Sequence, residues 1–135
     1  MKPDTRALVA ACAFVLLTDK KVAGLYDHAA GRRRKIAAER RGNQEQAFDG
    51  ERAAAISGAL PELFNAGDQS YIAFELTGDP VRDGVRKKVR GHDRHSNSDF
   101  EARAVDDALQ LYDYAEGAWF AFDIQNPDAA KSFYR

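Results

Sequence analysis

A seven-residue segment that occurs twice constrains the fold of this chain more than any other feature. Residues 25–31, Leu-Tyr-Asp-His-Ala-Ala-Gly, return 86 positions later as residues 111–117, Leu-Tyr-Asp-Tyr-Ala-Glu-Gly. Between them lie weaker copies, in which an aromatic or imidazole residue precedes Asp or Asn. We call these aromatic or imidazole residues the anchors; they are Tyr26, Phe48, Phe64, His92 and Tyr112. Internal repeats decide an architecture, and this spacing predicts five units of about 21 residues.

Each unit has the pattern of two strands joined by a turn. Five positions after the first and last anchors stand Gly31 and Gly117, which tolerate the left-handed backbone of tight turns. Beyond the turn the apolar residues alternate, as in Phe120, Phe122 and Ile124. Alternation with a period of two is typical of a strand with one buried face. We therefore predict hairpins over residues 21–125.

Residues 4–17 predict a helix that is apolar on every side, and such a helix has to be surrounded by other elements. The inward positions of the predicted hairpins include small residues that leave an interior empty: Ala38, Gly58, Ala102 and Ala104. The sequence thus predicts a mainly β fold, with five hairpin-like repeats in a closed or nearly closed up-and-down barrel around one apolar N-terminal α-helix. In architecture this resembles the tubby-like fold and the repeat-built barrels called beta-flowers; the resemblance carries no functional residues.

The main alternative is an Ala-rich helical or α+β domain. Alanine favours helices, and residues 99–116 also fit one helical face. We prefer strands because helices leave the matching segments at 25 and 111 unexplained. The chain reads as a single domain over 1–135, with a loop insertion near 79–88 and a tail over 126–135.

Composition indicates an ordinary globular chain with a formal net charge of −1 and a pI of about 6.3. No segment predicts a membrane span, because the apolar run at residues 7–17 is too short. The single cysteine, Cys12, lies in an apolar setting typical of a core thiol and cannot form an internal disulfide. We expect a cytoplasmic location; a secreted or lipid-anchored protein is the alternative, because residues 9–12 resemble the sequence before a lipoprotein cysteine.

Two basic runs, residues 32–41 and 86–94, are the candidate binding features. They predict contact with anionic lipid or another polyanion, although a pI near 6.3 argues against dedicated nucleic-acid binding. Arg34 has inward parity on its strand, so we expect a carboxylate partner or a place at the rim. The candidate anion-binding residues are Arg33, Lys35, Arg41, Arg86, Lys88 and Arg90.

Two further clusters have chemical potential. The Asp or Asn after each anchor could form a ring of carboxylates, but we interpret these residues as acceptors of backbone hydrogen bonds in turns. His92, His95 and Asp99 are a weak metal candidate, because His92 and His95 lie on opposite faces of a strand. No phosphate loop, nucleophile elbow or zinc-protease motif is present. We expect a non-catalytic binding or structural module without a cofactor, whose partner is unknown; another protein or anionic lipid are the alternatives.

Overall fold

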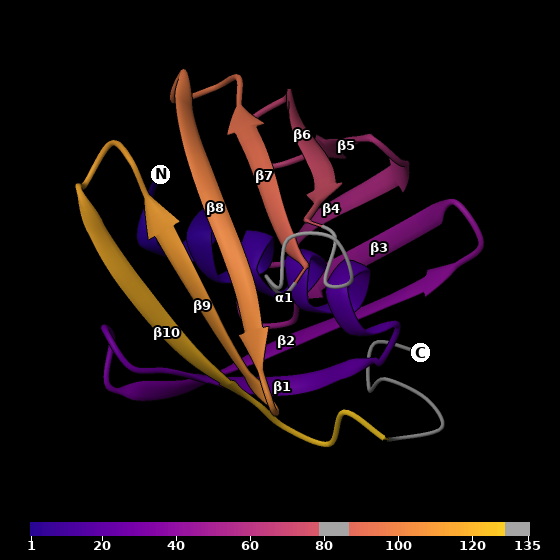
Figure 1. Ribbon diagram of the computed structural model, residues 1–135, viewed down its shortest axis with the longest axis vertical. Helices are drawn as coiled ribbons and strands as arrows, with labels where there is room; N and C mark the ends of the chain where they lie inside the picture. The colour runs from indigo at the N-terminus through magenta and orange to yellow at the C-terminus, as the bar shows by residue number, and fades with distance from the viewer. Residues whose placement is uncertain (79–86, 129–135) are drawn as a thin grey trace.

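The computed structural model describes residues 1–78 and 87–128, so most of the predicted insertion and most of the predicted tail lie outside the described residues. One helix precedes ten antiparallel strands, which close a barrel in the order β1-β10-β9-β8-β7-β6-β5-β4-β3-β2 (Figure 1). The elements are α1 (Pro3–Thr18), β1 (Val22–Asp27), β2 (Arg32–Arg41), β3 (Gln44–Asp49), β4 (Ala54–Ala59), β5 (Glu62–Asn65), β6 (Ser70–Thr77), β7 (Lys88–Asp93), β8 (Ser98–Val105), β9 (Ala108–Asp113) and β10 (Ala118–Ile124).

Successive strands form five hairpins that have the same register. In every hairpin the anchor pairs with the residue seven positions later. The pairs are Tyr26 with Arg33, Phe48 with Ala55, Phe64 with Tyr71, His92 with Asp99, and Tyr112 with Trp119. Because side chains alternate between the two faces of a strand, the anchors face outward and the Asp or Asn after each anchor faces inward. The matching segments at 25 and 111 therefore occupy equivalent places on β1 and β9.

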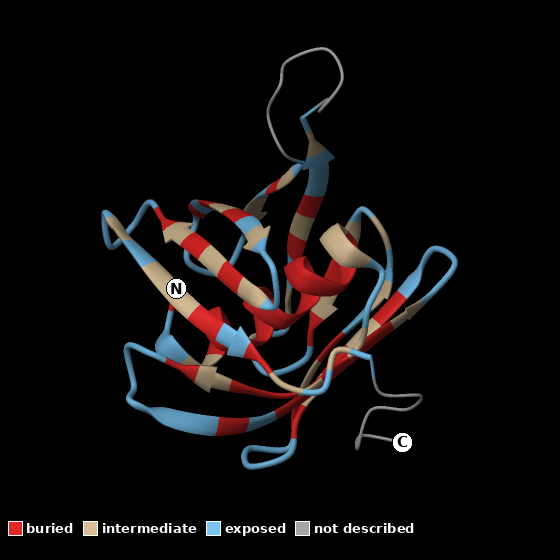
Figure 2. Cartoon of the chain, turned by 60° about the horizontal axis from the view of Figure 1, so that its bottom comes forward, coloured by how far each residue is buried: buried red, intermediate tan, exposed pale blue. Residues whose placement is uncertain are grey.

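Helix α1 fills the barrel and confirms the predicted arrangement of a central helix in a ring of hairpins (Figure 2). Residues 7–15 of the helix are at most 1% exposed. Small strand residues face it, and Ala38, Ala47 and Ala102 are also at most 1% exposed. Ala104 packs against this core and Gly58 is half-buried near the end of its strand. Among the described residues, no helix has the length and apolarity needed to cross a membrane.

The helical alternative for residues 99–116 is wrong. These residues form most of β8, all of β9 and the turns beside them. Alanine is tolerated in the strands because closeness to the helix, rather than intrinsic propensity, decides which side chain fits there. A larger residue at Ala102 would occupy space that α1 already fills.

The turns that follow the anchors lie at the barrel end where α1 begins. Arg6 of the first helical turns lies 3.4 Å from Asp113 at the end of β9, and Lys2 lies 3.3 Å from Asp68 in the β5–β6 turn. At the opposite end, Lys20 follows the helix and lies 3.7 Å from Asp107 in the β8–β9 turn. At both ends of the barrel, ion pairs therefore join residues near the ends of α1 to the hairpins.

Candidate functional site

The Asp or Asn after each anchor caps the turn of its own hairpin. All five residues are at most 3% exposed, and each side chain accepts a hydrogen bond from the backbone N–H of a residue two or three positions later. The donor-acceptor pairs are Ala30 with Asp27 (3.2 Å), Glu51 with Asp49 (3.0 Å), Gly67 with Asn65 (3.1 Å), His95 with Asp93 (3.1 Å) and Ala115 with Asp113 (3.1 Å). This confirms the interpretation of these residues as turn acceptors.

The first hairpin adds a buried ion pair to this turn. Arg34 is 4% exposed, its Nε donates to Asp27 Oδ2 at 2.7 Å, and its Nη1 donates to Asp4 Oδ1 of α1 at 2.6 Å. Burial opposes the charged guanidinium, but the two carboxylates outweigh it and raise the pKa of Arg34. The expectation that inward Arg34 needs a carboxylate partner is confirmed. Asp4 also complements the positive end of the helix dipole.

We expect an Asp→Asn substitution to lower the free energy of unfolding by different amounts in two of these turns, at Asp93 and at Asp27. Asp93→Asn keeps the Oδ1 acceptor, as Asn65 already does in the third hairpin, so the free energy of unfolding falls by about 1 kcal/mol or less. Asp27→Asn takes one of two carboxylates from buried Arg34 and costs about 2–3 kcal/mol. Urea unfolding at pH 7 measures both losses. Equal losses would show that the Arg34 pair adds nothing to the turn.

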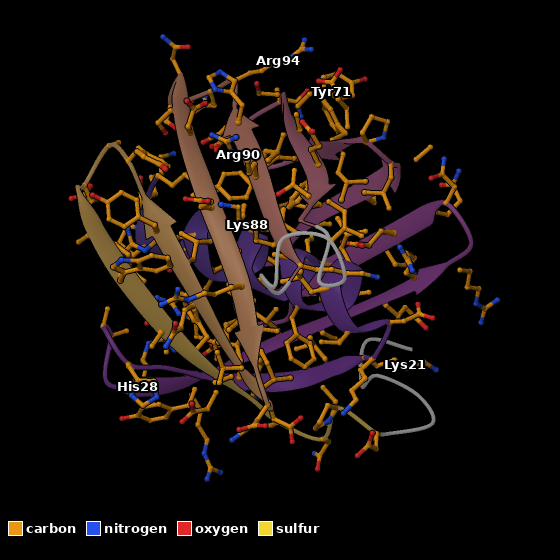
Figure 3. The ribbon with its side chains drawn as sticks, viewed as in Figure 1. Lys21, His28, Tyr71, Lys88, Arg90 and Arg94 are labelled. Atoms are coloured by element: carbon orange, nitrogen blue, oxygen red, sulfur yellow. The ribbon has the colours of Figure 1, made fainter. Side chains whose placement is uncertain are left out.

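The structure does not bring the two basic runs together. Arg33, Lys35 and Arg41 lie exposed on β2, whereas Lys88 and Arg90 lie on β7, and β2 and β7 are five steps apart in a ring of ten strands (Figure 3). Opposite sides of a barrel cannot rest on one flat surface together. Lys88 is already 2.7 Å from Glu101, and the fourth predicted residue of this run, Arg86, lies outside the described residues.

The candidate metal ligands are only partly brought together. His92 Nδ1 lies 2.7 Å from Asp99 Oδ1 on the outer face of β7 and β8. His95 lies in the following turn, where its Nε2 is 3.9 Å from Asp68 Oδ1. Within residues 1–78 and 87–128, no three His, Cys, Asp or Glu side chains are arranged to hold a metal ion.

Three aromatic side chains and one arginine form a continuous cluster on the outer face of β8–β10, which we call the aromatic face. Tyr112 packs edge-on against Tyr114 and Trp119, with ring centroids 4.8 and 5.2 Å apart. The guanidinium of Arg103 lies 4.5 Å from the centroid of the Trp119 ring. Tyr114 is 50% exposed and Trp119 is 49% exposed. The sequence analysis missed this cluster, although the shared outward parity of positions 112, 114 and 119 could have indicated it.

Carboxylates surround the aromatic face. Tyr114 Oη donates to Glu101 Oε2 at 3.0 Å, which holds the Tyr114 ring over β8 and raises the pKa of its hydroxyl. On the same side, a surface groove of about 410 Å3 lies over β6–β8, with Tyr114 as one wall. Its other polar lining residues are Glu75, Arg90, His92 and Asp99.

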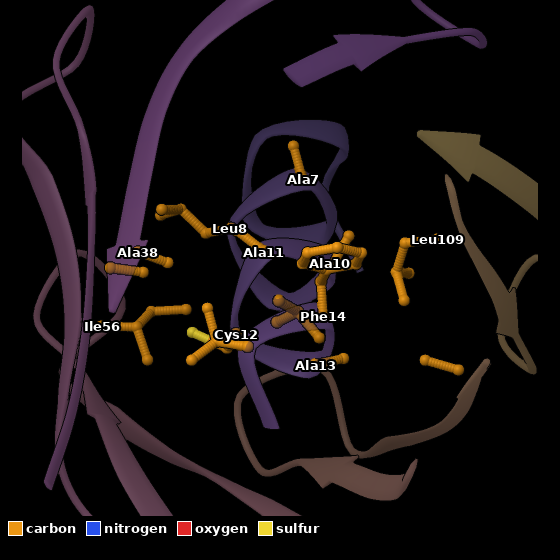
Figure 4. Close-up of a cluster of buried hydrophobic side chains, with 14 of the residues drawn as sticks. Ala7, Leu8, Ala10, Ala11, Cys12, Ala13, Phe14, Ala38, Ile56 and Leu109 are labelled. Carbon is orange, nitrogen blue, oxygen red and sulfur yellow. The ribbon is translucent and has the colours of Figure 1, made fainter. Parts of the chain in front are cut away.

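A buried carboxyl lies against the second half of α1. Glu45 on β3 is 2% exposed, and neither of its oxygens has a hydrogen-bond partner among the described residues. Burial raises the pKa of Glu45 to about 8, while the nearby Cys12 thiol and Arg40 guanidinium act in the opposite direction. Burial and Glu45 also raise the pKa of Cys12, which lies among buried Ala38 and Ile56 (Figure 4). Cys12 is therefore an unreactive core thiol.

Glu45 predicts a specific dependence of stability on pH. In the folded chain Glu45 keeps its proton up to about pH 8, whereas in the unfolded chain it ionises near its ordinary pKa of 4.5. The free energy of unfolding therefore falls between these two pH values, by on the order of 5 kcal/mol in total. Glu45→Gln has no ionisable group at this position and so avoids this loss. We expect the free energy of unfolding of the variant, relative to that of the native chain, to increase from pH 5 to pH 8.5.

Urea unfolding at several pH values measures this difference. The control is Glu116→Gln, which changes an exposed glutamate in the same way. If the stability difference between Glu45→Gln and the native chain does not change with pH, Glu45 is not held protonated in the fold.

Comparisons of the chain with protein-family models, with curated proteins and with solved structures gave no match. The functional argument therefore depends on the geometry of the barrel and its surface.

Proposed function

We propose that this chain is a non-catalytic binding module that contacts a partner protein through the aromatic face. Helix α1 occupies the barrel interior, and the closed ring of strands leaves no free edge for strand addition. Binding by β-augmentation or in a central ligand cavity is therefore disfavoured. The outer face of the barrel and its ends remain as places for recognition, and one end has a pocket lined by Met1, Lys2 and Glu116.

The observation that carries this proposal is the clustering of half-exposed Trp119 and Tyr114 around Tyr112, beside Arg103. Single exposed apolar residues are common and need no explanation, but contiguous ones mark interaction sites. Tryptophan, tyrosine and arginine are also the residues that contribute most to protein–protein binding energy. Their rings are held by one another and by Glu101, so little side-chain freedom would be lost on binding.

The five hairpins support a module of this kind. We attribute their common register to duplication of one hairpin, which provides the same scaffold five times. The outward residue seven positions after the anchor differs in each: Arg33, Ala55, Tyr71, Asp99 and Trp119. A constant inner face with variable outer positions allows one hairpin to specialise in recognition while the others maintain the barrel.

A matched pair of variants tests the proposed surface. Trp119 and Tyr71 have the same place in their hairpins, are 49% and 47% exposed, and both pack edge-on 5.2 Å from their anchors. Proteins retained by the immobilised chain are identified by mass spectrometry. The affinity of the most strongly retained protein for this chain is then measured directly. Trp119→Ala weakens that affinity by about 30-fold or more, whereas Tyr71→Ala leaves it nearly unchanged. Equal binding by both variants would place the contact elsewhere.

An alternative function is recognition of anionic lipid or polyanion, now confined to one basic run. The side chains of Arg33, Lys35 and Arg41 lie exposed on β2, where an anionic ligand can reach their charges. We expect Arg33→Gln with Lys35→Gln to lower the salt concentration that elutes the chain from heparin or from phosphatidylserine vesicles. Lys88→Gln with Arg90→Gln, on the opposite side, is the control. Retention that is unaffected by the β2 variant contradicts this alternative.

A further inference from the structure

We propose that the partner segment bound by the aromatic face is rich in arginine and lysine and lies extended along β9 and β10. This inference rests on the proposed function and adds the chemistry of the partner. It follows from the charges around the face, from the arginine already stacked on it, and from the position of competing cations.

The last described part of the chain is strongly acidic. Residues 99–128 contain eight Asp or Glu residues and only one basic residue, Arg103. Of the acidic residues, Asp99 and Glu101 lie on β8 beside the aromatic face. Glu116 lies in the β9–β10 turn, where it also lines a pocket with Met1 and Lys2, and Asp123 lies opposite Ala108 at the far end of β10. A surface with one sign of charge attracts a segment of the opposite sign and orients it as it approaches.

Most of this negative charge is not cancelled by a lysine or arginine. Asp99 and Asp123 are 69% and 59% exposed and contact only histidines, His92 at 2.7 Å and His28 at 2.9 Å. Glu116 makes no ion pair with a described residue. Glu101 has permanent cations beside it, Lys88 at 2.7 Å and Arg90, which pairs with it across β7 and β8. The exposed carboxylates of Asp99, Glu116 and Asp123 are the ones available to cations of a partner.

Arg103 shows how the aromatic face accepts a cation. Its guanidinium lies over the Trp119 ring, and its Nε donates to Gln110 Oε1 at 2.7 Å, which fixes that position. Aromatic faces carry partial negative charge and attract guanidinium groups. The exposed ring of Tyr114, beside Glu101, offers a second arrangement of an aromatic face next to a carboxylate, without an arginine stacked on it.

Cations on both sides restrict where such a segment can lie. Arg90 lies on β7, two strands from β9, and Arg33 lies on β2, two strands from β10. Both would repel a basic segment that crossed the barrel at right angles to the strands. Between them Tyr112 on β9 and Trp119 on β10 form the centre of the aromatic face, with Asp99 and Glu101 beside it on β8. This arrangement fits a single extended chain that follows the strands.

The single tryptophan makes this inference directly testable, because Trp119 is the only Trp of the chain. Its fluorescence is followed while three synthetic peptides of equal length are added, which alternate serine with arginine, with glutamate or with asparagine. We expect a saturable change with the arginine peptide alone. The affinity should fall about tenfold or more between low and high salt, because exposed charges are screened.

Charge variants locate the contact. Asp99→Asn with Glu116→Gln weakens binding of the arginine peptide several-fold. Asp106→Asn with Asp107→Asn removes the same charge from the opposite end of the barrel and has a much smaller effect. Circular dichroism establishes that both variants remain folded.

The outcomes separate this inference from the proposed function. No response to the arginine peptide, an equal response to all three peptides, or equal effects of the two charge variants overturns the inference. If the affinity for a captured partner still depends on Trp119 and not on Tyr71, the proposed function stands and only the cationic character of the partner is wrong. If the arginine peptide binds but Trp119→Ala leaves partner affinity unchanged, the face binds cations without being the partner surface.

Discussion

The structure depends on the burial of a helix that has no polar side. An isolated helix of this kind cannot remain exposed to water, and a ring of ten strands with small inward residues cannot pack its own interior. The barrel buries the apolar surface of the helix, and the helix fills the interior of the barrel. The alanines of the strands and of α1 allow close approach, so the helix packs directly against the inner face of the barrel. This mutual dependence explains why alanine, a strong helix former, is abundant in a mainly β protein.

Closure then determines where function can lie. A closed barrel has no strand edge, and α1 occupies its centre, so the recognition that we propose falls on the outer surface. The turn acceptors hold each hairpin in the same register from within, which leaves the outward positions free to vary. On the fifth hairpin these positions hold Tyr112, Tyr114 and Trp119. Stability and the proposed recognition are thereby assigned to opposite faces of the same strands.

The candidate sites were predictable to different degrees. Inward Arg34 and its carboxylate partner followed from strand parity, because alternation alone places a residue inside or outside. The separation of the two basic runs did not follow from the sequence pattern, because closure of the ring placed β2 and β7 on opposite sides. The aromatic face needed Arg103 from β8 to reach across β9 to Trp119 on β10. Buried Glu45 was missed because its environment depends on the position of α1, not on neighbouring residues.

The sequence by itself determined the number of hairpins, the central helix and the local turn chemistry. These depend on interactions within about 20 residues, which periodicity and turn residues report directly. Only the tertiary structure decided which strands became neighbours across the closed ring, which charges were cancelled, and which carboxyl was buried without a partner. The physical reason is that pairing of distant strands and desolvation are properties of the assembled barrel, and no local pattern of residues encodes them.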